Sequence, residues 1–160
     1  MHNIRIIKQY VISNSTFVIQ GKMMDGKLHS LVYDKDGYSL VNVKPNTLIG
    51  QALKKINSSF AHARDISRDV LGEHAKKLPI VVGNNFGQPI ITFPLFSPGS
   101  KDNCWVIYNP ITKIGSDKGL VHVEFKHEYD WTSSVSRQTF NNQYVNATNL
   151  FKAISQRWHP

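Results

Sequence analysis

Short hydrophobic runs alternate with polar positions over the first 43 residues of the chain. Their β-branched and aromatic residues predict strands, and a glycine after aspartate at Asp25-Gly26 and Asp36-Gly37 supplies the positive φ of a tight hairpin turn. Lys44-Pro45 should end the sheet, because proline has no N–H for a ladder. We therefore expect a β-meander from the runs "NIRIIKQYVI" (residues 3–12), "STFVIQGKM" (15–23), "KLHSLVYD" (27–34) and "YSLVNV" (38–43).

The hydrophobic period becomes helical from Thr47 onward, which predicts two short central helices. Asn57 and Ser58 offer side-chain oxygens that can cap the second helix, and Gly72 is placed to end it in a left-handed conformation. Arg64 borders the apolar stripe of that second helix. The apolar positions of the first helix are Ile49, Ala52, Leu53 and Ile56, and one face of the second contains Phe60, Ala63, Ser67 and Val70.

Short β runs return after Pro79. The gaps between these runs have no room for the helix of a parallel crossover, so the strands should pair mostly antiparallel. The predicted strands are "IVVG" (80–83), "PIITF" (89–93), "CWVIY" (104–108), "ITKIG" (111–115) and "LVHVEF" (120–125).

The last 20 or so residues form an amphipathic helix with apolar side chains four and three residues apart. This spacing fits packing on the sheet of the same chain, and it also fits a short coiled-coil seam between two copies. Both readings stay open. The candidate self-association residues are Phe140, Tyr144, Phe151 and Ile154, and the same seam continues through Ala147 and Trp158.

A chain of 160 residues supports one hydrophobic core, so residues 1–160 should form a single domain. The expected fold class is α+β, with a mainly antiparallel β-sheet, two short central helices and a C-terminal helix. No apolar run reaches the ~20 residues of a membrane helix, and the N-terminal residues lack a secretion signal. Cys104 is the only cysteine and cannot form an internal disulfide. We expect a cytoplasmic protein without a membrane partner.

The formal charge of +8 and the pI near 9.6 favour an acidic partner, with nucleic acid first. The stretch from Lys44 to Lys77 holds seven basic residues against three acidic ones. Asp65 and Asp69 flank Arg68 at helical distances, so a surface ion pair is the alternative role for that arginine. The candidate DNA-contacting cations are Lys54, Lys55, Arg64, Arg68, Lys76 and Lys77.

No catalytic or metal-binding motif emerges from the residue spacing. The nearest candidate is His122 with Glu124, which strand periodicity puts on one sheet face, where a polar surface is the ordinary explanation. A hydrolase would need a third group, such as Asp130, in the same cleft. We expect no enzymatic activity, no metal and no cofactor.

An ordered series of short stretches resembles the competence transcription factor family of Gram-positive bacteria, the ComK family. It covers about residues 16 to 157. The stretches are "DGK" (25–27), "VNVKP" (41–45), "SSFAHAR" (58–64), "KLPIVV" (77–82), "FPLFS" (93–97), Cys104-Trp105 and "SRQTFNNQYVNATNLF" (136–151).

The resemblance implies a transcriptional activator of DNA-uptake genes that reads AT-rich promoter boxes through the minor groove as a dimer or a pair of dimers. It makes Arg64 the first choice for DNA contact, with Ser58 and Ser59 as phosphate-binding candidates. RNA polymerase is an implied partner, and the site of action is the nucleoid. Relatives extend beyond Trp158, and that tail contacts the adaptor of a Clp-type protease, so the shorter tail argues against adaptor control here.

Three alternatives remain. Residues 48–71 contain two helices and so admit a major-groove helix-turn-helix, although the join at Asn57-Ser58 looks shorter than its usual turn. A protein-interaction module would use the basic charge only for solubility, with Trp105, Trp131 and Trp158 as anchors. The third alternative is a shortened relative of the family that does not activate transcription, a non-activating paralogue.

Overall fold

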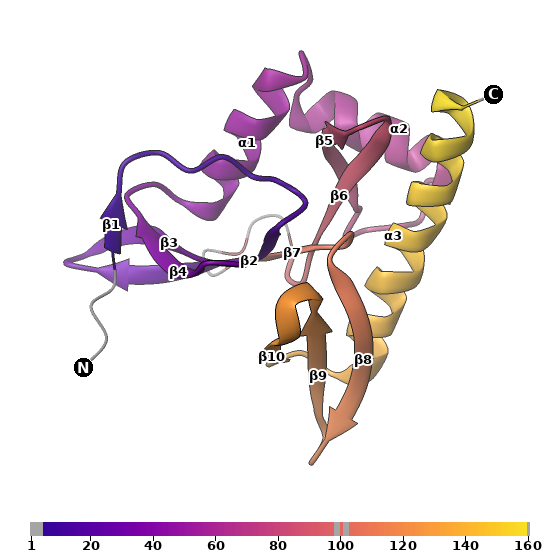
Figure 1. Ribbon diagram of the computed structural model, residues 1–160. Coiled ribbons are helices and arrows are strands. Elements are labelled where there is room, and N and C mark those ends of the chain that lie inside the picture. The colour runs from indigo at the N-terminus through magenta and orange to yellow at the C-terminus, as the bar shows by residue number, and fades with distance from the viewer. Residues whose placement is uncertain (1–4, 98–99, 101–102, 160) are drawn as a thin grey trace.

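The computed structural model describes residues 5–97, 100 and 103–159. Its largest element is a seven-stranded sheet with the order β1-β4-β3-β2-β7-β6-β5 (Figure 1). All neighbouring strands pair antiparallel except β1 and β4, which are parallel. The strands are β1 (Arg5–Ile7), β2 (Thr16–Met24), β3 (Lys27–Asp34), β4 (Gly37–Val41), β5 (Ile80–Asn85), β6 (Gln88–Pro94) and β7 (Cys104–Ile107).

The N-terminal meander is confirmed at β2, β3 and β4. Asp25 and Gly26 both have positive φ, at 51° and 76°, as a two-residue hairpin turn requires. The first predicted strand is shorter than its hydrophobic run, because the chain leaves the sheet after Ile7. Residues 3 and 4 of that run, and residues 98, 99, 101 and 102 between β6 and β7, lie outside the described residues.

Two helices follow the meander, α1 (Pro45–Lys55) and α2 (Phe60–Leu71). Pro45 stands in the first turn of α1, so this helix begins two residues before the expected Thr47. The cap of α2 is Ser59 rather than Asn57 or Ser58, and its hydroxyl accepts a hydrogen bond from the His62 N–H at 3.1 Å.

The expected short join between α1 and α2 is wrong, because four residues from Ile56 to Ser59 separate the two helices. Asn57 turns the chain there with a φ of 55°. At the other end of α2, Gly72 has a φ of 92° but an extended ψ of 164°, so it ends the helix without the expected left-handed conformation. The four-residue connection between α1 and α2 has the length of the turn in a helix-turn-helix.

A second, three-stranded antiparallel sheet has the order β10-β9-β8 and consists of β8 (Ile111–Asp117), β9 (Leu120–Phe125) and β10 (Tyr129–Ser133). The sequence pattern predicted β8 and β9 but missed β10. A one-turn 3-10 helix, η1 (Lys126–Glu128), joins β9 to β10, with positive φ at His127 and Glu128. No glycine marks this turn, so the usual hairpin signal is absent.

The long helix α3 (Arg137–Trp158) starts at Ser136, whose hydroxyl accepts the Thr139 N–H at 3.2 Å. Figure 1 shows it running along the side of the molecule past β6 and the second sheet. Hydrophobic side chains pack on both faces of the seven-stranded sheet. One core holds Ile19, Ile49, Leu53, Ile80 and Trp105 with α1, and the other holds Phe17, Phe93, Phe125, Phe140 and Leu150 with α3 and β9.

The 4-3 seam of α3 is used mainly by the chain itself. Phe140 is fully buried and Ile154 is 4% exposed, so neither can form a free self-association surface. Tyr144 and Phe151 are half-buried and stack beside Tyr108, at 5.3 and 5.6 Å between ring centroids. The structure thus supports packing on the chain's own sheet at the two buried positions. A contact between copies through Tyr144 and Phe151 stays a prediction.

The expected α+β class is confirmed, with a mostly antiparallel sheet, two short central helices and a C-terminal helix. Within the part of the chain that the structure describes, no helix has both the length and the apolar character needed to cross a bilayer.

Candidate nucleic-acid interface

Four chain segments meet at one end of the molecule, at the top of Figure 1: the last turn of α1, the start of α2, the β5–β6 hairpin and the last turn of α3. Residues from all four segments line two neighbouring spaces, which share Gly83 and Asn84 of β5. We name this region the basic end and define it by Lys54, Lys55, Ser58, Ser59, Arg64, Phe86 and Arg157.

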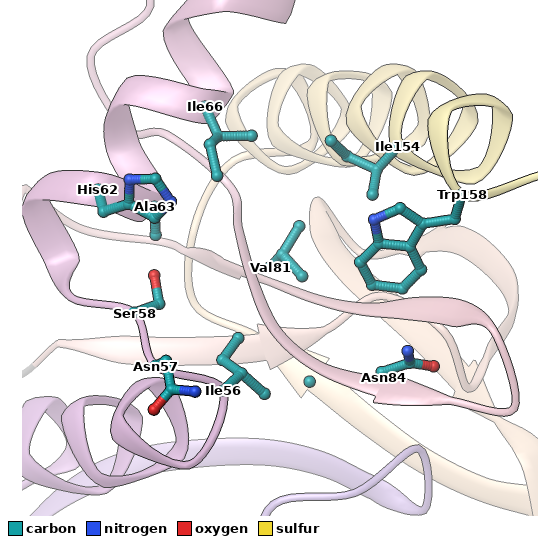
Figure 2. A pocket seen from close by; sticks show the side chains of 11 residues that line it. Ile56, Asn57, Ser58, His62, Ala63, Ile66, Val81, Asn84, Ile154 and Trp158 are labelled. Carbon is teal, nitrogen blue, oxygen red and sulfur yellow. The ribbon is translucent and has the colours of Figure 1, made fainter.

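The first space is an apolar hollow of about 270 Å³ beneath the start of α2. Figure 2 shows Ser58 and His62 on one side of it and Trp158 on the other, with Val81 of β5 between them. Ile66 and Ile154 add apolar side chains from α2 and α3. The hollow therefore fixes how the start of α2 sits against the end of α3.

The second space is a groove of about 480 Å³ between α1, β5 and residues 9–12. Lys54 and Lys55 are exposed and line it from the last turn of α1. Tyr10 fixes the opposite wall, because its hydroxyl donates to Asp34 Oδ2 and lies 2.9 Å from both that oxygen and Thr16 Oγ1. Burial raises the pKa of the Tyr10 phenol above its usual range, so the group stays neutral.

The start of α2 presents backbone amides to solvent. The N–H groups of Phe60 and Ala61 open the helix and have no intrahelical acceptor by position. Ser59 is exposed, and its hydroxyl accepts the His62 N–H and keeps a proton to donate. The half-buried Ser58 hydroxyl donates to the Ser59 carbonyl at 3.4 Å. Such an end attracts a phosphate oxygen through the amides and the helix dipole.

Arg64 lies one helical turn further along α2 and is half-buried. Its guanidinium carbon is 5.1 Å from the centroid of the Phe60 ring, which in turn packs against Trp105. The stacked ring holds the stem of the arginine while leaving its donors free for a partner.

Carboxylates are absent from most of the segments that form the basic end. Every Asp and Glu falls within residues 25–36, 65–73 or 102–130. Consequently α1, the first turn of α2, the β5–β6 hairpin and α3 contain no carboxylate side chain. The cations at this end face few opposing charges and produce a locally positive potential.

Of the predicted DNA-contacting cations, Lys76 and Lys77 lie beyond the far end of α2, and Arg68 has an acidic partner. Arg68 forms a surface ion pair with Asp65, at 3.3 Å between Nη1 and Oδ1, so the alternative role holds for it. Lys77 follows α2, and its backbone carbonyl accepts a hydrogen bond from Gln143 in the first half of α3. Lys76 is its neighbour. α2 has 12 residues and is therefore about 18 Å long, and these lysines follow its far end.

Two residues of the basic end were missed by sequence reasoning, namely Phe86 and Arg157. Arg157 belongs to the last turn of α3 and is exposed. Its signal was the absence of acidic residues after Asp130, which leaves the cations of α3 unbalanced. Phe86 stands in the β5–β6 turn, where "NNFGQ" looked like an ordinary loop.

Of the three tryptophans considered as protein-binding anchors, Trp105 is excluded by its burial, at 3% exposure. Its indole N–H donates to Asn46 Oδ1 at 2.8 Å, which ties β7 to α1. Trp131 is half-buried against the core, and Trp158 is 39% exposed beside the apolar hollow. Only Trp158 offers substantial surface for a partner.

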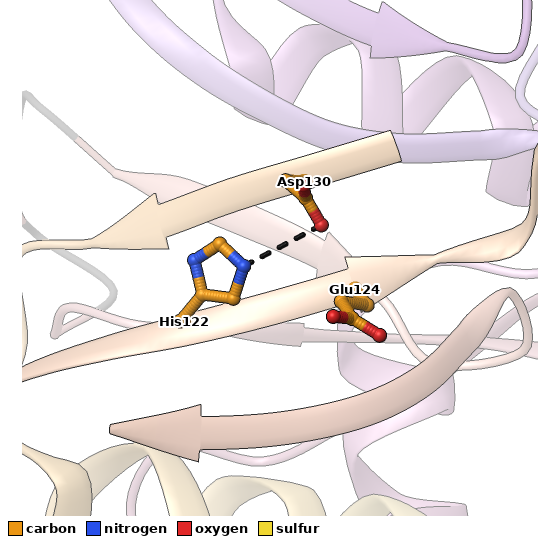
Figure 3. A group of neighbouring side chains, drawn as sticks. All are labelled: His122, Glu124 and Asp130. Atoms are coloured by element: carbon orange, nitrogen blue, oxygen red, sulfur yellow. Dashed lines mark ion pairs between the residues drawn. The ribbon is translucent and has the colours of Figure 1, made fainter. Parts of the chain in front are cut away.

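His122, Glu124 and Asp130 do come together on the outer face of the second sheet (Figure 3). The His122 Nε2 lies 3.4 Å from Asp130 Oδ1, and the nearest donor atoms of all three lie within 4.8 Å of one another. Asp130 joins the group because β10 pairs it with Glu124. On the other side of Glu124, β8 places Lys113, whose positive charge suits a salt-bridged surface.

A shallow hollow of about 260 Å³ next to this cluster is lined by His122 and Glu124 but not by Asp130. The hollow takes in two of the three groups that the hydrolase alternative needs in one cleft. Cys104 offers no nucleophile either, since burial raises the pKa of its thiol to about 12.

The family of the chain follows from comparison with known proteins. The family model described as ComK protein matches residues 7–159, nearly the whole chain. No curated protein and no solved structure matches it. The match agrees with the motif series in the sequence, including the stretch that contains Ser58, Ser59 and Arg64. The chain belongs to the ComK family, a family of competence transcription factors.

Proposed function

We propose that residues 1–160 form one DNA-binding domain that activates competence genes by binding AT-rich promoter boxes through the minor groove. The observation that carries this proposal is the basic end, where Lys54, Lys55 and Arg157 stand on helices without a carboxylate and Arg64 extends from α2 with its guanidinium on the Phe60 ring. A polyanion is the natural ligand of such a surface.

The minor groove fits the basic end better than the major groove does. A·T-rich minor grooves are narrow and strongly negative, and they attract arginine side chains. Arg64 is pre-oriented on Phe60 for this role. The amides of Phe60 and Ala61 and the hydroxyls of Ser58 and Ser59 suit an adjoining backbone phosphate.

A major-groove helix-turn-helix is the second candidate, because the four-residue join between α1 and α2 has the right length. The outer face of α2 argues against it. Asp65 and Asp69 are both exposed there, and Asp65 has a relative side-chain exposure of 73%. Two carboxylates on a recognition helix would meet the phosphates that flank the groove.

The proposal includes a symmetric assembly. Inverted boxes in a promoter are read by a two-fold symmetric protein, so a homodimer or a pair of dimers is the expected form on DNA. RNA polymerase is the partner through which activation proceeds, and the protein acts at the nucleoid in the cytoplasm. No cofactor, metal or membrane takes part.

The test is fluorescence anisotropy with a labelled A·T-box duplex and a G·C-rich duplex of equal length. We expect tighter binding to the A·T box and an affinity that falls as salt rises, with a log–log slope of roughly −0.9 per phosphate contact. A small minor-groove ligand should displace the protein. A flat salt response would favour the protein-interaction module, and full binding to ligand-blocked boxes would favour α2 in the major groove.

A further inference from the structure

Phe86 is the most exposed large hydrophobic side chain of the described residues, at 100% exposure. It occupies the first position of the two-residue turn between β5 and β6, where Asn85 pairs with Gln88. The ring belongs to neither hydrophobic core. Folding of the chain therefore gains nothing from an aromatic side chain at this position.

The backbone at Phe86 also disfavours an aromatic residue. Its φ is +51° and that of Gly87 is +84°, a pair of left-handed values that turns usually assign to Asn, Asp or Gly. The two similar turns of the chain place Asp25 and Lys118 at the corresponding position. The β5–β6 turn thus holds a bulky ring in a strained backbone and directs it into solvent.

The tip that carries the ring is held from two sides. Asn84 Oδ1 accepts the Gly87 N–H at 2.8 Å, and His159 Nε2 lies 2.7 Å from the Gly87 carbonyl oxygen. A Cβ at Gly87 would approach the His159 ring to 2.9 Å, so the two groups are closely fitted. A ring on a fixed support loses little conformational entropy when it binds.

Cations lie on the segments that meet around the β5–β6 turn. Asn84 lines the same groove as Lys54 and Lys55, and it lines the apolar hollow together with Ser58. Arg157 lies two residues before His159, the C-cap residue of α3, which contacts the turn. No acidic residue occurs between His74 and Lys101 or after Asp130. The turn that carries the ring thus belongs to a region with cations and, in the β5–β6 hairpin and α3, no carboxylate.

We propose that Phe86 is an apolar wedge that enters the minor groove of bound DNA and partly unstacks one base step, a role that rests on the proposed function. Minor-groove proteins insert such side chains and kink the duplex by roughly 20–90°. Pyrimidine–purine steps such as TA open most easily, and A·T-rich boxes contain them. A stackable ring on a surface that carries cations matches a polyanion with an apolar interior better than it matches a protein pocket.

The test uses the full chain and an A·T-box duplex with a fluorescent adenine analogue at each TA step in turn and a dye pair at the ends. Wild type should brighten the analogue at one step and shorten the end-to-end distance. Phe86→Ala should bind roughly 5- to 150-fold more weakly, the loss of one stacked base, and should give neither signal. Its salt slope should stay unchanged, because no charge is removed.

Two further variants make the result specific. Leu120→Ala removes an exposed hydrophobic side chain next to the Lys118-Gly119 turn of β8 and β9, and it should keep affinity, unstacking and bending. Phe86→Asn replaces the ring with a residue that suits the left-handed turn. It should melt at or above the temperature of wild type and should still lose both signals, which separates loss of the wedge from misfolding.

Wild-type binding without unstacking, or signals that persist in Phe86→Ala, would overturn the wedge while leaving the proposed function intact. Unchanged DNA affinity in Phe86→Ala would assign the ring to a protein partner instead and would also overturn it. Failure of wild type to bind the duplex at low salt would overturn the proposed function itself.

Discussion

The guanidinium of Arg64 stacks on the ring of Phe60 one turn earlier in α2, with 5.1 Å between the guanidinium carbon and the ring centroid. Phe60 in turn packs beside Trp105, with 6.2 Å between the ring centroids. The arginine is therefore oriented by the hydrophobic core and not by an acidic partner. Its positive charge remains available to an external anion.

Arg64→Ala should weaken binding to A·T-box DNA by about 1–3 kcal/mol, or roughly 5- to 150-fold. The free energy of unfolding should fall by only about 0.5–1 kcal/mol, the usual contribution of a cation–π contact. Anisotropy titrations and urea denaturation measure the two quantities. Arg68→Ala is the matched control from the same helix, since Arg68 is paired with Asp65, and its effect on affinity should be clearly smaller. Equal losses in the two variants would contradict a special role for Arg64.

Gln143 should be critical for stability although it lies far from the basic end. Its side-chain amide is buried and donates to the carbonyls of Lys77 and Pro94, at 2.7 and 2.8 Å. Gln143→Leu leaves both carbonyls without this donor, so the free energy of unfolding should drop by about 2–4 kcal/mol. Urea denaturation measures the loss. Asn142→Ala, at an exposed neighbouring position of α3, should change it by less than about 0.5 kcal/mol, and a similar loss in both would argue against the buried bridge.

Cys104 should resist thiol reagents in the native protein. Burial raises the pKa of its thiol from an ordinary value of 9.0 to about 12, and the residue is 5% exposed. Labelling at pH 8 should be on the order of 10³-fold slower than in denatured protein, because access requires opening of a core strand. Labelling rates with and without urea test this.

The raised pKa of the Cys104 thiol also predicts that the free energy of unfolding depends on pH. Below about pH 9 the Cys104 thiol is protonated in both the folded and the unfolded state, so it does not change the free energy of unfolding. Between about pH 9 and 12 the unfolded thiol ionises while the folded one does not, so the free energy of unfolding should fall as the pH rises. Cys104→Ala should show a smaller alkaline loss than wild type. An identical alkaline profile in the two proteins would remove Cys104 as a cause.

The strands that sequence predicted well are those with local signals. The Asp25-Gly26 pair marks the hairpin between β2 and β3 directly in the sequence. The run "LVHVEF" alternates in the sequence, and in β9 its residues alternate between buried and outward-facing positions. β10 was missed because its preceding turn uses positive φ at His127 and Glu128, which no glycine signals. The division into two sheets depends on which edges remain unpaired, and that is a property of the whole chain.

The candidate site was only half visible in the sequence, for a similar reason. Lys54 and Lys55 were found from local charge density, while the family resemblance pointed to Ser58, Ser59 and Arg64, and all five are close in sequence. Phe86 and Arg157 reach the same end only through the β5–β6 pairing and the length of α3. Lys76 and Lys77 carried the same charge signal, yet the length of α2 moves them away.

The two aromatic residues of the α3 seam should respond differently to truncation, because Phe140 is fully buried while Phe151 is half-buried. Phe140→Ala should cost about 3–5 kcal/mol of the free energy of unfolding, since it leaves a cavity beside Phe93, whose ring centroid is 5.5 Å away. Phe151→Ala should cost less, because its ring loses contact with Tyr108 at one edge only. If Tyr144 and Phe151 also join two copies, sedimentation should show that Phe151→Ala shifts the protein toward monomer at concentrations where it remains folded. A folded Phe151→Ala that associates as wild type does would place the contact between copies elsewhere and leave this ring a purely intramolecular role.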